Sequence, residues 1–212
     1  MKSFIIVLIT CMLVALNLSA TNYHDVMKQN ITKLIKSNSI EEINQIAATF
    51  ERIANAEKEE WLPRYYSAYA HARATHFMSD TDSIDVSLDK AQAYINELLK
   101  SNEDESEVHV LQALVYSLRI TSASRGYKYS SLSNKSLDRA MQLNAENPRI
   151  YYCRGNNVFN TPKMFGGGAT KAEKLFTTAN EKFESEKQEN ELWPSWGLYH
   201  NTQMLKKCKE SN

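Results

Sequence analysis

The sequence predicts an all-α protein built from paired antiparallel helices, and three observations support this fold class. Apolar residues recur at helical spacing, as in 39–57, where the apolar stripe is Ile40, Ile43, Ile46, Ala47, Phe50, Ile53 and Ala54. No stretch shows the sustained alternation of polar and apolar residues that is typical of a half-buried strand. Helix-start signals precede the periodic segments, because Ser39 followed by Glu42 forms a capping box.

Nine helices are expected in order along the chain. Pro148 begins one of them, which is the position where a helix tolerates proline. Thr170 followed by Glu173 forms a second capping box. The turns are short and polar, apart from longer connections at 121–131 and 161–169. The expected helices are 24–37, 39–57, 61–79, 85–101, 106–122, 132–144, 148–160, 170–185 and 190–209.

Composition excludes several classes of protein. Twenty-five Lys and Arg balance twenty-five Asp and Glu, so the chain lacks the basic excess that is typical of a nucleic-acid binder. Six Gly and four Pro are few for a barrel or sandwich rich in turns. Three Cys do not make a disulfide scaffold. The length of 212 residues suits a single domain with a substantial core.

The first twenty residues have the pattern of a secretory signal peptide. Lys2 is the single charge before Ala20, an apolar stretch runs between them, and the segment ends in Leu18-Ser19-Ala20. We expect cleavage after Ala20 and a mature chain, 21–212, that is periplasmic or secreted and forms one domain without a membrane span. The alternative is an uncleaved N-terminal membrane anchor, since Leu18 is large for its position.

An internal repeat organises the predicted helices. In 170–185 a small residue is followed by an aromatic four places later and a small one three places after that, at Ala172, Phe176 and Ala179. Each helix of this kind is followed by a helix with a large residue four places before a small one, and the small residues Ala113, Gly155 and Gly197 are spaced 42 residues apart. A repeating hairpin of this kind predicts stacked helix pairs.

These residues resemble the tetratricopeptide repeat (TPR), in a degenerate form similar to exported bacterial members of that family. The resemblance implies a right-handed α-solenoid of about nine helices over most of 39–209. Small residues let the helices of a hairpin approach closely, and large residues fill the holes between hairpins. The alternative is a helical bundle without a true repeat.

The TPR resemblance also implies a concave groove lined by the first helix of each hairpin. Aromatic residues and Arg in such a groove are typical of binding sites, and Asn can bond an extended peptide backbone. The groove residues taken as a candidate binding site are Tyr65, Tyr69, Arg73, Leu114, Arg149, Tyr152, Asn156, Phe159 and Asn160. The alternative is that these residues are core, because a short array can pack its last helix into its own groove.

No catalytic or cofactor site is expected. The five His have no spacing that lets two imidazoles share a zinc ion, so neither a metal site nor a cofactor is predicted. Cys153 and Cys208 are expected to lie too far apart for a disulfide. Gly166-Gly167-Gly168 lacks the Lys and Ser or Thr of a phosphate loop, and a flexible connection beside Phe165 is preferred.

Two functions fit these features, and neither is enzymatic. The first is an exported TPR-like scaffold that binds a protein or peptide segment in its concave groove. The alternative is a small-molecule-binding accessory module of an envelope transport system, which would need a closed pocket lined by Tyr65, Arg73, Tyr152 and Asn156. The sequence names neither the partner nor the ligand.

Overall fold

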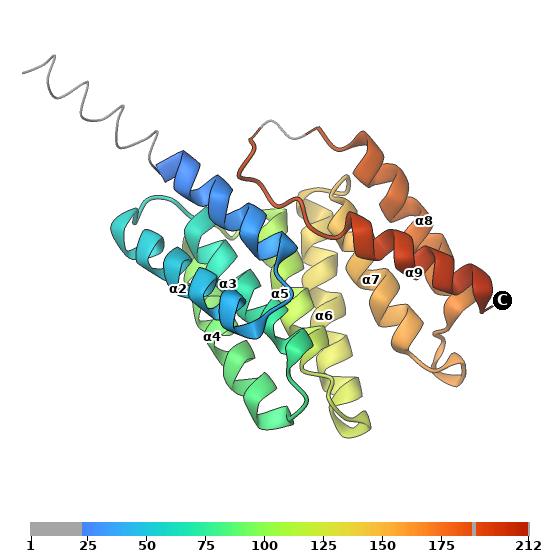
Figure 1. Cartoon of the computed structure of the whole chain (residues 1–212). Coiled ribbons are helices and arrows are strands. Elements are labelled where there is room, and N and C mark those ends of the chain that lie inside the picture. Colours follow the sequence, from blue (N-terminus) through green and yellow to red (C-terminus); the bar gives the residue numbers. More distant parts are fainter. Residues whose placement is uncertain (1–22, 188–189, 212) are drawn as a thin grey trace, which may run out of the picture.

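The structure is all-α, as the sequence predicts. The computed structural model describes residues 23–187 and 190–211, and those residues form nine α-helices (Figure 1). A first helix covers residues 23–36. The others are α2 (Ile40–Ala56), α3 (Leu62–Ala74), α4 (Thr81–Ser101), α5 (Ser106–Leu118), α6 (Ala123–Leu143), α7 (Pro148–Asn160), α8 (Ala169–Ser185) and α9 (Leu198–Glu210). Short 3₁₀ turns, η1 (Thr75–Phe77) and η2 (Lys163–Phe165), follow α3 and α7.

The helices stack as hairpins. Helix α3 packs against α4, α5 against α6 and α7 against α8. Helices α3, α5 and α7 form an inner row, because α5 also contacts both α3 and α7. Figure 1 shows these hairpins side by side, with α2 covering one end of the array and α9 lying beside α7 and α8 at the other. This arrangement is the α-solenoid that the repeat predicts.

The repeat residues occupy buried positions where helices meet. Ala172, Phe176 and Ala179 of α8 are fully buried, as are the equivalent Ala91, Ile95 and Leu98 of α4. Gly155 of α7 lies directly against Phe176, because a Cβ atom at Gly155 would be 2.6 Å from Cε1 of that ring. The small residue therefore allows the close approach of α7 and α8.

Alanine at two helical glycines should have opposite effects on stability. Gly155→Ala forces a methyl group into the buried Phe176 ring, and overpacking costs about 1–3 kcal/mol. That cost exceeds the roughly 1 kcal/mol that alanine gains in helix propensity. Gly126→Ala in α6 meets open space, so it should stabilise the protein by about 0.5–1 kcal/mol. Urea unfolding of both variants measures the difference, and equal shifts would contradict the close contact.

Two helices, α6 and α9, begin far from their predicted starts. Helix α6 begins at Ala123, about nine residues before the expected 132, because the two Arg125 guanidinium nitrogens donate to the Asp85 carboxylate of α4 at 2.8 and 2.7 Å. Helix α9 begins at Leu198 instead of 190, because residues 190–197 adopt a non-helical path across the inner row. At Ser39 the predicted cap is confirmed, since its hydroxyl oxygen accepts from the Glu42 backbone N–H.

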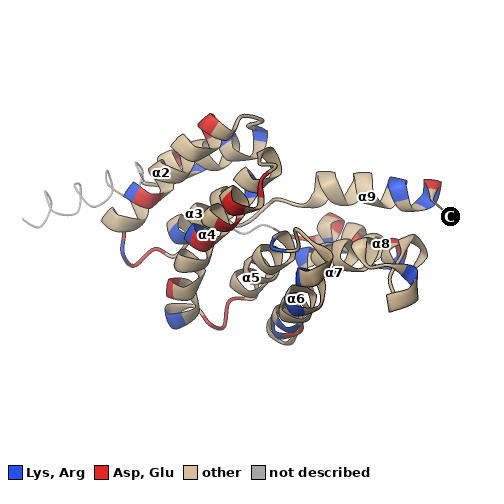
Figure 2. Cartoon of the chain, turned by 90° about the horizontal axis from the view of Figure 1, so that it is seen from below, with Lys and Arg blue, Asp and Glu red and all other residues tan. Residues whose placement is uncertain are grey.

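The predicted signal peptide, 1–20, lies outside the residues that the structure describes. Within the described part of the chain, every helix is too short or too polar to cross a lipid bilayer. Acidic and basic side chains are interspersed over the helices (Figure 2), and the last turn of α9 carries Lys207 and Lys209.

Candidate functional site

Part of the predicted groove is filled by the chain itself. Residues 192–197, named here the groove segment, follow α8 and cross the inner row before α9 begins (Figure 1). The Trp196 ring stacks on Tyr69 with centroids 5.0 Å apart, and its Nε1–H donates to the Tyr65 hydroxyl at 2.8 Å. The Tyr66 hydroxyl donates to the Leu192 carbonyl oxygen at 2.9 Å. These contacts seal the N-terminal half of the groove.

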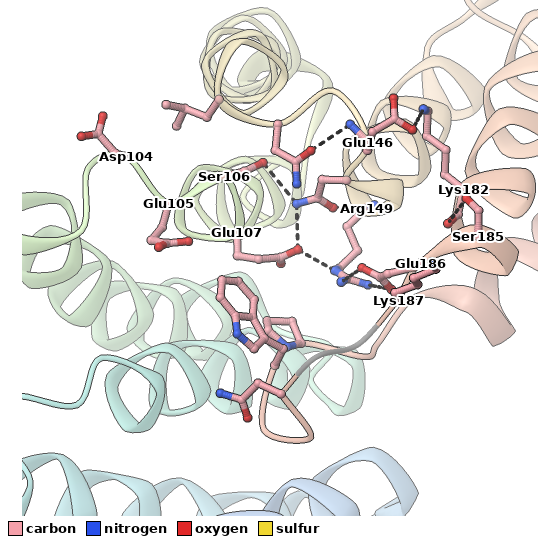
Figure 3. A pocket seen from close by; sticks show the side chains of 16 residues that line it. Asp104, Glu105, Ser106, Glu107, Glu146, Arg149, Lys182, Ser185, Glu186 and Lys187 are labelled. Carbon is pink, nitrogen blue, oxygen red and sulfur yellow. Dashed lines mark hydrogen bonds and ion pairs between the residues drawn. The ribbon is translucent and has the colours of Figure 1, made fainter.

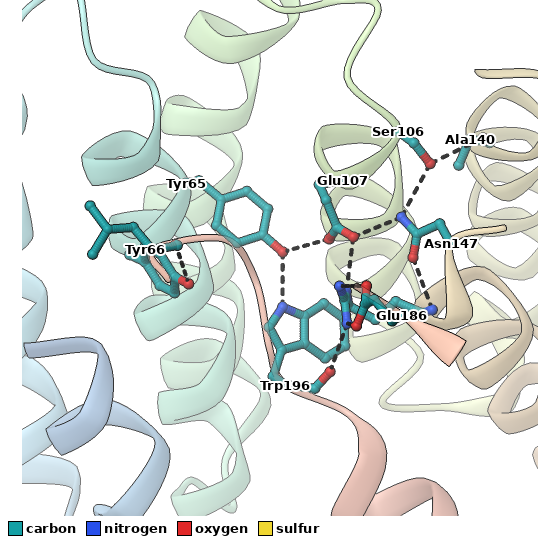
Figure 4. A network of polar contacts seen from close by, with 10 residues as sticks. Tyr65, Tyr66, Ser106, Glu107, Ala140, Asn147, Glu186 and Trp196 are labelled. Atoms are coloured by element: carbon teal, nitrogen blue, oxygen red, sulfur yellow. Dashed lines mark hydrogen bonds and ion pairs between the residues drawn. The ribbon is translucent and has the colours of Figure 1, made fainter. Parts of the chain in front are cut away.

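A buried ionic network lies beneath the groove segment (Figure 4). The Arg149 Nε–H donates to the Glu107 carboxylate at 2.8 Å, and the end of the same guanidinium forms a two-point ion pair with Glu186. The Glu107 carboxylate also accepts from the Tyr65 hydroxyl at 3.2 Å and from the Asn147 amide at 2.7 Å. Four elements, α3, α5, α7 and the end of α8, are therefore joined through one carboxylate and one guanidinium.

Arg149 keeps its charge in this network. Its side chain is 2% exposed, and burial alone disfavours a charged guanidinium. The negative charges of Glu107 and Glu186 outweigh burial and raise the pKa of Arg149. Because every polar group of Arg149 already has a partner inside the protein, the residue holds the fold together and is not free to bind a peptide carboxylate.

A polar hollow opens beside this network, where α5 and α7 begin and α6 and α8 end (Figure 3). Its volume is about 810 Å³, and Glu107, Arg149 and Glu186 lie within it. The Lys182 ammonium on its wall pairs with Glu146 at 2.8 Å. Burial, with the nearby charges of Glu107 and Asp104, raises the pKa of Glu105. The charges of this hollow are mostly paired with one another, which is typical of a structural feature and not of a ligand site.

The remaining groove residues are only partly brought together. Arg73 is half-buried and donates to the Ile35 and Ser37 carbonyl oxygens at 3.3 and 2.7 Å, so it closes the C-terminal end of the first helix. Tyr65, Tyr69 and Tyr152 are buried against Trp196, which matches the alternative interpretation that these residues belong to the core. Leu114, Asn156 and Phe159 are half-buried and Asn160 is exposed on the inner row. The closed pocket expected around Tyr65 and Arg73 is occupied by protein.

The C-terminal half of the inner row stays accessible and presents imidazole and aromatic groups. The Tyr152 hydroxyl is 2.8 Å from Nδ1 of His200, and the two rings meet edge to face. Phe159 and Lys207 lie seven residues after Tyr152 and His200 in their helices. The Lys207 ammonium is 5.1 Å from the centre of the Phe159 ring. Helix α9 thus runs alongside α7. We name this surface the His200 face: Tyr152, Phe159, His200 and Lys207.

His76 lies in η1, at the end of α3, and its charge acts on His200. Partial burial lowers the pKa of His200, and the positive charges that His76 and Lys207 can carry lower it further. Burial also lowers the pKa of His76, and this outweighs the backbone hydrogen bond to Arg73 that favours the charged form. Both imidazoles are therefore biased toward the neutral form.

Neither thiol contributes an accessible nucleophile. Cys153 and Cys208 are both free and buried. Burial raises the pKa of the Cys153 thiol, with the Glu107 charge adding to the effect, so the thiolate is strongly disfavoured. Among the described residues, no three His, Cys, Asp or Glu are grouped so that they could hold a metal ion.

Sequence reasoning missed Trp196, Glu107 and His200. Pro194 and Gly197 were available signals, since both oppose a continuous helix over 190–209, and Gly197 has a φ of 111°. His200 is 48 positions from Tyr152 in the chain, so only the fold brings these two rings together. No local sequence pattern indicates this contact.

The fold and the inner row define a TPR-like helical-repeat protein, as the resemblance implies. A thermophilic TPR protein of Thermus thermophilus has a similar structure, with a TM-score of 0.57 over 89% of this chain and 90% of that chain, at 14% identity. The HusA haemophore from Porphyromonas gingivalis is more similar: the TM-score is 0.79 and the identity 26%, over 90% of this chain and 94% of that chain. No protein-family model and no curated protein matches the chain.

Proposed function

We propose that this protein is an exported, non-enzymatic binding protein whose ligand is haem or a closely related porphyrin, held on the His200 face. The observation that carries the proposal is the similarity to a haemophore over nearly the full length of both chains. The proposal corresponds to the small-molecule function that the sequence left as the alternative. Export is part of it, through the expected signal peptide at 1–20.

The chemistry of the His200 face supports a flat, partly apolar, anionic ligand. Phe159 is half-buried and His200 is exposed, so both offer aromatic surface against which a large conjugated ring can pack. Lys207 lies beside the Phe159 ring, where its ammonium can pair with a carboxylate side chain of a porphyrin. Tyr199, which is 80% exposed, lies next to His200 in the chain and adds apolar surface at the protein boundary.

The protein- or peptide-binding function has less support. Its strongest candidate residues, Tyr65, Tyr69, Arg149 and Tyr152, are covered by the groove segment or used in the buried network. What remains for a protein partner is the loop at η2, where Met164 and Phe165 are 83% and 73% exposed. Large exposed apolar side chains of this kind are typical of contact surfaces.

A titration with haemin tests the proposed function. The purified protein should produce a saturable change in the haemin Soret band with one ligand per chain. Lys207→Glu should weaken haemin binding about fivefold, because the pairing with a porphyrin carboxylate, worth up to about 1 kcal/mol at an exposed site, is lost. Lys206→Glu is the matched control, since that neighbouring side chain is 72% exposed and pairs with Glu210 on the same helix.

Two results would count against this proposal. Absence of a saturable Soret change would remove haem as the ligand. Equal weakening by Lys206→Glu and Lys207→Glu would indicate a general charge effect and would leave the His200 face without support. A protein partner captured through Phe165 in the absence of any porphyrin binding would favour the scaffold function.

A further inference from the structure

We infer that the connection between α7 and α8 docks the protein on an anionic lipid surface. Met164 and Phe165 enter the lipid interface, and the Lys side chains around them pair with the headgroups. The surface consists of residues 161–174 and 202–211, named here the docking end. This inference goes beyond the proposed function, because lipid docking needs no porphyrin.

Two adjacent large apolar side chains project from the docking end into solvent. Met164 and Phe165, both in η2, are 83% and 73% exposed. The preceding Pro162 and Lys163 are exposed as well. Burying a Met or Phe side chain is strongly favourable, and large apolar groups that stay together at the surface mark a contact site. The tip of the connection therefore has apolar surface that a second phase can cover.

Hydrogen bonds hold this tip in one conformation. The N–H groups of four consecutive residues, 165–168, donate to the backbone carbonyl oxygens of residues 158, 162 and 163 at 2.9–3.2 Å. A Cβ atom at Gly167 would lie 2.0 Å from the Thr161 carbonyl oxygen, so this path requires glycine. Because these donors are already paired inside the protein, the tip can enter an apolar interface without leaving their N–H groups unsatisfied.

Basic side chains surround the tip. Segments 161–174 and 202–211 together hold six Lys, two Glu and no Arg, although the whole chain is neutral. The two segments lie at the same end of the molecule, because the Lys207 ammonium is 5.1 Å from the ring of Phe159 in the last turn of α7 (Figure 1). The six basic side chains, all exposed, are Lys163, Lys171, Lys174, Lys206, Lys207 and Lys209.

The positive charge at the start of α8 opposes the local preference of the helix. Helix α8 begins at Ala169, has Lys171 in its first turn and has no acidic residue there. The N-terminus of a helix favours negative charge, so Lys171 does not stabilise α8 through the helix dipole. Residues that break a local rule in this way are typical of functional surfaces.

The chemistry of the docking end favours lipid over a protein partner. Protein interfaces are enriched in Arg and depleted in Lys, whereas this end has six Lys and no Arg. Two apolar side chains are also few for the roughly 800 Å² that each partner buries in a stable protein complex. Lys ammonium groups bind anionic headgroups while an aromatic side chain enters the acyl boundary, which is how peripheral proteins attach to membranes.

Co-sedimentation with lipid vesicles tests the inference. The mature chain, 21–212, is used, so that the apolar segment 1–20 does not itself bind lipid. It should bind vesicles made of equal parts of phosphatidylglycerol and phosphatidylcholine, bind them more weakly in high salt, and not bind pure phosphatidylcholine. Met164→Ser combined with Phe165→Ser should weaken binding about tenfold. Lys163→Gln combined with Lys174→Gln should also weaken it about tenfold.

Two matched controls separate this surface from general effects. Lys90→Gln combined with Lys100→Gln removes the same charge from exposed positions of α4 and should leave vesicle binding unchanged. Tyr199→Ser removes an aromatic side chain that is 80% exposed, in the first turn of α9 and away from its basic end, and should also leave binding unchanged. Circular dichroism checks that each variant is folded.

Three results would overturn the inference. The first is absence of wild-type binding to the phosphatidylglycerol vesicles at low salt. The second is equal weakening by the two pairs of Lys variants with no effect of the Met164 and Phe165 substitutions, which would indicate a general charge effect. The third is binding to envelope membranes that contain protein but not to pure lipid vesicles, which would make the partner a protein. None of these results depends on the haemin titration.

Discussion

Arg149→Leu is expected to destabilise the protein by about 3–5 kcal/mol, the cost of leaving a buried charge without its partner. In this variant the Glu107 and Glu186 carboxylates lose the guanidinium that lies between them. Glu107 is 5% exposed, so water cannot replace the lost partner without opening the junction of α5 and α7. Urea unfolding followed by circular dichroism gives the change in the free energy of unfolding.

Arg139→Leu is the control for this prediction. Arg139 pairs with Asp104 at 3.2 Å, but both side chains are exposed, and pairs of this kind contribute about 0–1 kcal/mol. A triple variant in which Arg149, Glu107 and Glu186 all become apolar should recover part of the stability, since a whole buried ionic network can often be replaced at little cost. If Arg149→Leu were no more damaging than Arg139→Leu, the network would not hold the helices together.

Trp196→Ala is expected to destabilise the protein by about 3–5 kcal/mol as well, for a different reason. The substitution removes an indole that stacks on Tyr69 and meets Tyr152 edge to face. It also leaves the buried Tyr65 hydroxyl without its donor. Because the inner row is fixed on both sides, the site should collapse little, and a cavity should remain where the groove segment was anchored.

Thermal and urea unfolding measure this effect, with Tyr199→Ala as the control. Tyr199 is a comparable aromatic three residues further on, but it is 80% exposed, and its removal should change stability by at most about 0.5 kcal/mol. Similar losses for the two variants would mean that the groove segment is not anchored by Trp196. In that case the concave groove would be open to an external peptide.

The fold could be predicted from the sequence because its determinants are local. The spacing of Ala172, Phe176 and Ala179 identifies the buried stripe of α8, and Pro148 and Ser39 mark helix starts. The first nine residues of α6 could not be predicted in this way. They are rich in Ser and contain Gly126, and what holds them as a helix is the distant ion pair of Arg125 with Asp85.

The candidate site was less predictable, because it depends on a segment outside the repeat. The repeat register places Tyr65, Tyr69 and Tyr152 on the inner row, where the structure also has them. The register cannot reveal that Trp196 covers these three side chains. The register assigned 190–197 to a helix, although Pro194 and Gly197 oppose one. Tyr152 and His200 are 48 positions apart in the chain, so their contact follows from the fold and from no local pattern.

Hydrogen exchange with and without haemin, read by mass spectrometry, tests most directly where the ligand binds. We predict slower exchange in peptides that cover the first two turns of α9. Peptides around 104–107 and 182–187, at the polar hollow, should not change. Protection confined to the polar hollow, or exchange unaffected by saturating haemin, would contradict a porphyrin site on the His200 face.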